Sequence, residues 1–182
     1  MDGEIVLPDY DRYLFSLFIA TLELRTPASM DALAYILRWF DTEAKELDVK
    51  TLQKAALNFL EPSSHAEYNA DKFYKMEWAI INTNSTIGFC TSDHPVVRVN
   101  KEHCDLSPWN LPTDILSLDN PDVAIILPLT PKLCFLAQHA GNISIPQTGE
   151  FFARCLNAYE FLGCDNLLIG DNQNILKEFL AP

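Results

Sequence analysis

Residues 78–97 read WAIINTNSTIGFCTSDHPVV and decide the fold of the C-terminal half. Two apolar runs, 77–82 and 86–91, flank the turn-forming residues Asn-Thr-Asn-Ser, which predicts a β-hairpin. The second run is followed by a polar loop, 91–95, and by another short strand over 96–100. A polar loop held between strands is a common place for chemistry or ligand binding.

The rest of the C-terminal half follows the same alternation of short apolar runs and turns. Strands are predicted over 123–128 and 133–138, joined by the turn Leu-Thr-Pro-Lys, and over 166–170. Helices are predicted over 150–160 and 175–180. The proline-rich stretch between 101 and 121 has no regular pattern, and loops of this length are usually functional or mobile.

The N-terminal half has the spacing of amphipathic helices, with apolar residues three and four positions apart. We predict helices over 9–25, 28–47, 49–59 and 66–75, the first ending at Thr26-Pro27 because proline disfavours helical geometry in the preceding residue. The predicted fold class is α+β, in which a helical N-terminal half packs on a mixed or antiparallel β-sheet formed by the C-terminal half. We expect one domain over 1–182, with a helical part at about 9–75 and a sheet part at about 76–182.

Composition limits the partners and the compartment. The formal net charge of −12 argues against nucleic acid, since phosphate binding needs a cationic face, and it suits a basic protein partner. No apolar run reaches the roughly 18 residues of a membrane span, and the acidic N-terminus is unlike a signal peptide. The five cysteines are an odd number with no C-x-x-C pair, which indicates reduced thiols. We therefore predict a cytoplasmic protein that does not bind membranes.

The polar loop carries the candidate catalytic residues Ser92, Asp93 and His94. Asp93 could act as a general base or orient His94, and Ser92 could be a nucleophile if a base lies within hydrogen-bond reach. In an extended segment Ser92 and His94 share one face while Asp93 points to the other. The structural alternative is that Ser92 and Asp93 accept backbone N–H bonds and set up the turn before Pro95.

Arg25 is the candidate ligand-binding cation, together with Thr91. An arginine at a helix C-terminus complements the helix dipole, which would be a purely structural role. It could instead reach inward to Asp93, either as a buried structural pair or as part of a site for an anionic small molecule.

A metal site is the weakest of the chemical hypotheses. Cys90, His94, His103 and Cys104 offer four zinc-type ligands in one window, but their spacing matches no familiar zinc module. The chain also lacks the glycine-rich phosphate-binding motifs and the common hydrolase and metalloprotease motifs. We predict no metal and no cofactor.

Several blocks together resemble the DUF4238 family, a prokaryotic domain of unknown function. They are Arg25-Thr26-Pro27, the block from Phe89 to Val96, the strand and turn Ile126-Leu127-Pro128-Leu129-Thr130-Pro131, and a later segment around Asn157. The resemblance covers about 11–170 and shares Arg25, Ser92, Asp93 and Pro95 with the family's pattern. Members of the family usually begin with a segment rich in His, Pro and Tyr, and we expect this segment to be missing here. The family implies no established activity.

Two functional hypotheses follow. The first is a small-molecule or nucleotide-directed enzyme, or the remnant of one, with a polar cleft formed by Arg25 and Ser92-Asp93-His94. The second is an acidic interaction module, a subunit or inhibitor in a bacterial or phage defence setting, that binds a basic partner.

Overall fold

The computed structural model describes residues 7–26, 48, 50–51, 54, 64–100, 117–140, 150–173 and 176–177. The described helices are α1 (Asp9–Leu24), α4 (Ser64–Lys75) and α5 (Glu150–Gly163). The strands are β1 (Glu77–Asn82), β2 (Thr91–Ser92), β3 (Val97–Asn100), β4 (Val123–Pro128), β5 (Leu133–Gln138) and β6 (Leu168–Ile169). The α+β prediction is confirmed: helices occupy the N-terminal half and a four-stranded antiparallel sheet the C-terminal half.

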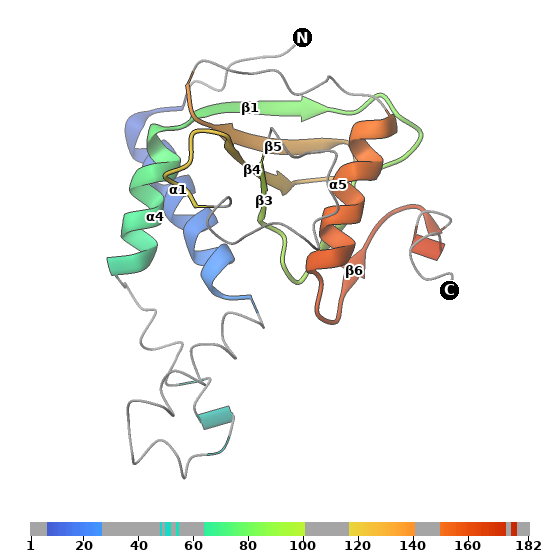
Figure 1. The fold of residues 1–182 in the computed structure, drawn as a ribbon, viewed down its shortest axis with the longest axis horizontal. Coiled ribbons are helices and arrows are strands. Elements are labelled where there is room, and N and C mark those ends of the chain that lie inside the picture. Colours follow the sequence, from blue (N-terminus) through green and yellow to red (C-terminus); the bar gives the residue numbers. More distant parts are fainter. Residues whose placement is uncertain are drawn as a thin grey trace.

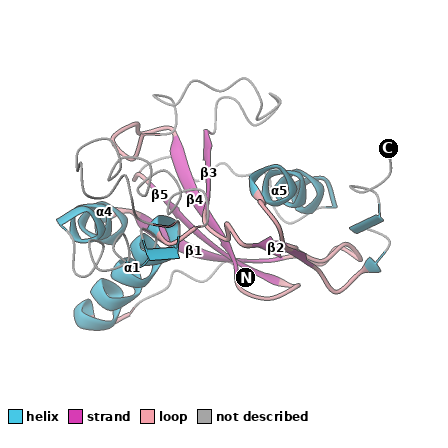
Figure 2. Ribbon diagram, turned by 90° about the horizontal axis from the view of Figure 1, so that it is seen from below, coloured by secondary structure: helices cyan, strands magenta, loops and turns pink. Residues whose placement is uncertain are grey.

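The main sheet has the strand order β1-β5-β4-β3, and each neighbouring pair is antiparallel. Helices α1 and α4 lie side by side on one face of it, and α5 lies on the other (Figures 1 and 2). The strand period of two explains how both faces are filled. Phe135 and Ala137 of β5 join the core beneath α1 and α4, while Cys134 and Leu136 join the core beneath α5. Because both faces are covered, every residue of β4 is buried.

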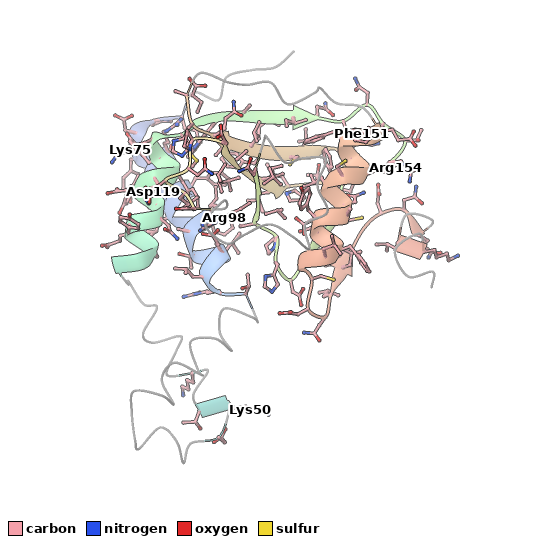
Figure 3. The ribbon with its side chains drawn as sticks, in the orientation of Figure 1. Lys50, Lys75, Arg98, Asp119, Phe151 and Arg154 are labelled. Atoms are coloured by element: carbon pink, nitrogen blue, oxygen red, sulfur yellow. The ribbon has the colours of Figure 1, made fainter. Side chains whose placement is uncertain are left out.

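Two arginines tie α1 to the rest of the molecule. The Arg12 guanidinium donates hydrogen bonds to the carbonyl oxygens of Tyr74 and Met76, and it lies 4.1 Å from the centre of the Trp78 ring. At the other end of the helix, Glu23 Oε1 accepts a hydrogen bond of 2.5 Å from Nε of Arg98, which is labelled on β3 in Figure 3. These contacts fix which face of α1 meets the sheet.

The predicted hairpin over 77–91 is wrong. β1 pairs with β5, and of the second run only Thr91 lies in a strand, the short β2, which pairs with β6. The backbone groups of residues 88–90 form hydrogen bonds outside any hairpin. The Phe89 N–H donates to the Pro131 carbonyl, and the Asn157 side chain bonds to the Gly88 carbonyl and the Cys90 N–H. Apolar character alone does not choose a strand's partner. The predicted helices over 28–47, 49–59 and 175–180 lie mostly or wholly outside the described residues.

Candidate functional site

The loop and strand from Gly88 to His94, called segment 88–94 below, are held by one side chain of α5. Asn157 is fully buried, and its Oδ1 accepts a hydrogen bond of 2.7 Å from the backbone N–H of Cys90. Its Nδ2 donates a bond of 2.9 Å to the carbonyl oxygen of Gly88. A side-chain amide that matches a backbone donor and acceptor in this way replaces a strand partner. Asn157 therefore sets the path of the chain into the polar loop.

One turn further along α5, Glu160 meets Ser92. The Ser92 Oγ donates a hydrogen bond of 2.7 Å to Glu160 Oε2 and accepts one of 3.0 Å from the backbone N–H of His94. Glu160 is fully buried, and Ser92 is 8% exposed. Asn157 and Glu160 are three residues apart, so they lie on the same face of the helix, above segment 88–94.

The environment of Glu160 favours the protonated carboxyl. Burial raises the pKa of Glu160 to about 7, and the hydrogen bonds from Ser92 offset only part of that rise. Among the described residues, no donor or acceptor lies within hydrogen-bonding distance of Glu160 Oε1. The carboxyl thus changes protonation near neutral pH and has one oxygen without a bond to the described part of the chain.

Asp93 bonds to the loop that follows α5, while Ser92 bonds to Glu160. Its carboxylate oxygens accept hydrogen bonds of 3.0 and 2.9 Å from the backbone N–H groups of Asp165 and Asn166. Burial acts to raise the pKa of Asp93, but these backbone donors outweigh it and hold the pKa below its usual value. Asp93 therefore anchors the loop that follows α5.

His94 and Thr91 take different positions around the Ser92–Glu160 pair. The Nε2 atom of His94 lies 3.0 Å from Oδ2 of Asp165, and the two side chains are 20% and 39% exposed. Thr91 pairs through its backbone with Ile169 of β6. His94 and Asp165 form the more exposed side of the site.

Arg25 lies just beyond the C-terminal end of α1 and is exposed. Within the described residues, no hydrogen bond or ion pair joins it to Asp93, whose carboxylate is bonded to the backbone of Asp165 and Asn166. The sequence hypothesis of an Arg25–Asp93 pair therefore has no support in this geometry.

The environment of the cysteines near the site disfavours the thiolate form. Burial, together with the charges of Asp171 and Glu160, raises the pKa of Cys90 to about 11. Burial also raises the pKa of Cys164. No cluster of three metal-binding side chains occurs among the described residues, and His103 and Cys104 lie outside them.

Sequence reasoning missed Asn157 and Glu160 as site residues. The signal was the helical period itself, because Ala153, Leu156, Asn157 and Glu160 fall at spacings of three and four and are the buried residues of α5. Two polar residues on the buried stripe of an amphipathic helix must find partners inside the protein. Segment 88–94 provides them.

The model of the family described as "Protein of unknown function (DUF4238)" matches residues 2–173, so the chain belongs to this family. No curated protein matches the chain. No solved structure matches it either. Across the described residues, no helix has the length and apolar character needed to cross a membrane.

Proposed function

We propose that this member of the DUF4238 family is an enzyme that transfers an acyl or phosphoryl group of a small molecule to water, with Ser92 as nucleophile and Glu160 as general base. The observation that carries the proposal is the 2.7 Å hydrogen bond from Ser92 Oγ to Glu160 Oε2. A serine is a weak nucleophile until a base within hydrogen-bond reach accepts its proton.

The protonation state of Glu160 supports this assignment. A general base works best when its pKa lies near the working pH, and burial raises the pKa of Glu160 to about 7. A strongly raised pKa with a specific partner is typical of functional sites. The nearby thiols of Cys90 and Cys164 have raised pKa values, so they carry less thiolate, the reactive form, than an ordinary cysteine.

The proposed reaction has two halves. Ser92 Oγ forms a bond to the acyl carbon or phosphorus while its proton moves to Glu160 Oε2. The bond to the leaving group breaks, and the leaving group keeps the electron pair and takes the proton from Glu160. Water then attacks the Ser92 ester, Glu160 accepts a proton from the water, and the ester bond breaks as Glu160 returns that proton to Ser92 Oγ. Nucleotides fall within this substrate class through their phosphoryl groups.

The other site residues have positioning roles in this proposal. The backbone N–H of His94 directs the Ser92 oxygen, and Asp93 fixes the adjoining loop through Asp165 and Asn166. The His94 imidazole and Asp165 lie on the more exposed side, from which a substrate would approach. Arg25 and Thr91 remain predicted ligand-binding residues.

A fluorophosphonate probe tests the proposal without a known substrate, because it reacts preferentially with activated serine hydroxyls, forming an O–P bond and releasing fluoride. We expect one probe adduct per chain, on Ser92, by intact-mass and peptide mass spectrometry. Ser92→Ala should remove the adduct and Glu160→Gln should nearly abolish it, while Ser85→Ala should leave it unchanged. Folded wild-type protein that forms no adduct on Ser92 would overturn the proposal.

The second candidate function is an acidic interaction module that binds a basic partner, with a setting in bacterial or phage defence as part of that hypothesis. It is supported by the net charge of −12 and by exposed carboxylates such as Glu67 and Asp71 on α4. Cations such as Arg12 and Lys72 are engaged within the protein. The test is binding of a lysine decapeptide, which should weaken with salt and with Glu67→Gln plus Asp71→Asn. Peptide binding that changes neither with salt concentration nor with the two substitutions would exclude this function.

A further inference from the structure

Helix α1 presents an apolar stripe to solvent, formed by Tyr10, Leu14 and Phe18. These side chains are 71%, 42% and 51% exposed, and Leu7, just before the helix, is 36% exposed. The spacing of four residues puts them on one side of the helix, opposite the buried Ser16, Ile19 and Ala20. The solvent side of an amphipathic helix is normally polar, so a row of large exposed apolar residues marks an interaction surface.

Opposite charges lie near the two ends of α1, on the side of the helix that carries the stripe. The exposed Asp11 is in the first turn of α1, and the exposed Arg25 directly follows its last turn. At about 100° per residue, Arg25 is roughly 60° and Asp11 roughly 100° around the helix from Tyr10. Both therefore lie on the side of α1 that carries the stripe. Arg12 does not supply the cation for this surface, because its guanidinium contacts the carbonyl oxygens of Tyr74 and Met76 and the ring of Trp78.

We propose that the stripe is the docking surface for a second copy of this chain, with the two α1 helices antiparallel across a twofold axis. A twofold interface must be complementary to itself. An antiparallel pair meets this condition because Asp11 of each copy then approaches Arg25 of the other. It also brings opposite ends of the two helix dipoles together, which adds to the attraction.

The size of the stripe sets the strength of this dimer. One helix face from each copy buries less than the roughly 1,200 Å² of total surface found in stable complexes. The dimer should accordingly be weak and depend on protein concentration. The centre of the interface is apolar. A register that pairs Asp11 with Arg25 puts residue 18, halfway between them, at the twofold axis, so the exposed Phe18 rings of the two copies meet there.

Sedimentation velocity of the full chain over micromolar to near-millimolar concentration tests the proposal. We expect reversible dimerisation, and Phe18→Glu should weaken it about 100-fold or more, because it puts two charges at the centre of the interface. Phe151→Glu is the matched control, since Phe151 is 68% exposed on α5 and away from the stripe, and it should leave the dimer unchanged.

A charge exchange tests the antiparallel arrangement. Asp11→Arg and Arg25→Asp should each weaken the dimer about tenfold, and the double variant should recover most of the loss because the attraction is restored in reverse. A wild-type chain that stays monomeric at all concentrations would overturn the proposal and leave the stripe to a different partner. An equal effect of Phe151→Glu, or a double variant no better than the worse single one, would overturn it as well.

Discussion

The Ser92 hydroxyl donates a hydrogen bond of 2.7 Å to Oε2 of the fully buried Glu160. This contact joins residues 68 positions apart in the chain and brings the polar loop against the inner face of α5. It gives Ser92 a base within reach, and it gives a buried carboxyl a hydrogen-bond donor. Both consequences can be measured.

The first prediction concerns the protonation of Glu160. The Glu160 carboxyl holds its proton more tightly in the folded protein, where its pKa is about 7, than in the unfolded chain, where it is about 4.5. The stability contributed by this difference is therefore complete below pH 4.5 and is lost as pH rises through about 7. Glu160→Gln keeps an acceptor for Ser92 and removes the titration. From pH 4.5 to pH 8, the unfolding free energy of wild type should therefore fall by about 3 kcal/mol relative to that of Glu160→Gln, as measured by urea titration.

The exposed Glu67 on α4 offers a control for this experiment. The difference in unfolding free energy between Glu67→Gln and wild type should stay constant across the same pH range. A Glu160→Gln curve that also runs parallel to wild type would mean that Glu160 does not titrate as described.

The second prediction concerns Asn157. Asn157→Ala leaves the Cys90 N–H and the Gly88 carbonyl without their partner inside the protein, and each unsatisfied buried group costs about 1–3 kcal/mol. We expect a loss of about 3 kcal/mol in urea titration, against less than about 0.5 kcal/mol for the exposed Asn84→Ala. A loss below 1 kcal/mol would contradict the role of Asn157 in holding segment 88–94.

The third prediction separates Asp93 from Arg25. Asp93→Asn weakens the bonds to the Asp165 and Asn166 N–H groups and should cost about 1 kcal/mol at neutral pH. Because folding lowers the pKa of Asp93, this contribution is present above pH 3.8 and fades as pH falls through the folded-state pKa. Arg25→Ala should cost less than about 0.5 kcal/mol, and the two effects should add. Strong non-additivity in the double variant would mean that the two side chains do interact.

The fourth prediction uses two glycines. A Cβ at Gly170 would lie 2.8 Å from the buried Cys90 Sγ, whereas a Cβ at Gly163 would lie 4.0 Å from the nearest atom, His94 Cβ. Gly170→Ala should therefore destabilise the protein by about 1–3 kcal/mol, as overpacking does. Gly163→Ala should be neutral or slightly stabilising. Equal thermal stability of the two variants would contradict the close packing of residue 170 against the segment that carries Ser92.

The sequence predicted the elements whose signal is local. α1, α4, α5 and strands β1, β4 and β5 follow from apolar spacing and turn residues, and the structure has them within a few residues of the expected bounds. The hairpin failed because the partner of β1 is β5, more than fifty residues away, and the turn-like residues after β1 gave no sign of it. Choosing between strand partners depends on long-range packing that a local pattern does not contain.

The candidate site divides in the same way. The loop 91–95 was identified because polar residues interrupt apolar runs. The different partners of Ser92 and Asp93 are set by the bend that follows β2, which the extended-strand expectation did not include. Glu160 was missed because a glutamate in a helix is ordinary, and only its place on the buried stripe of α5 distinguishes it. The Arg25–Asp93 hypothesis paired a cation and a carboxylate on chemistry alone. In the structure, the Asp93 oxygens accept hydrogen bonds from the backbone N–H groups of Asp165 and Asn166.

The most direct test of the central claim is the rate at which the fluorophosphonate probe modifies Ser92 as a function of pH, in wild type and in Glu160→Gln. If Glu160 is the base, the wild-type rate rises with pH and levels off with a midpoint near 7, where Glu160 becomes ionised. The variant should then be slower by about 100-fold or more at pH 8, since general base catalysis contributes about that much. Equal rates in the two proteins, or a wild-type rate that rises with hydroxide concentration without levelling off, would contradict the assignment of Glu160 as the base for Ser92.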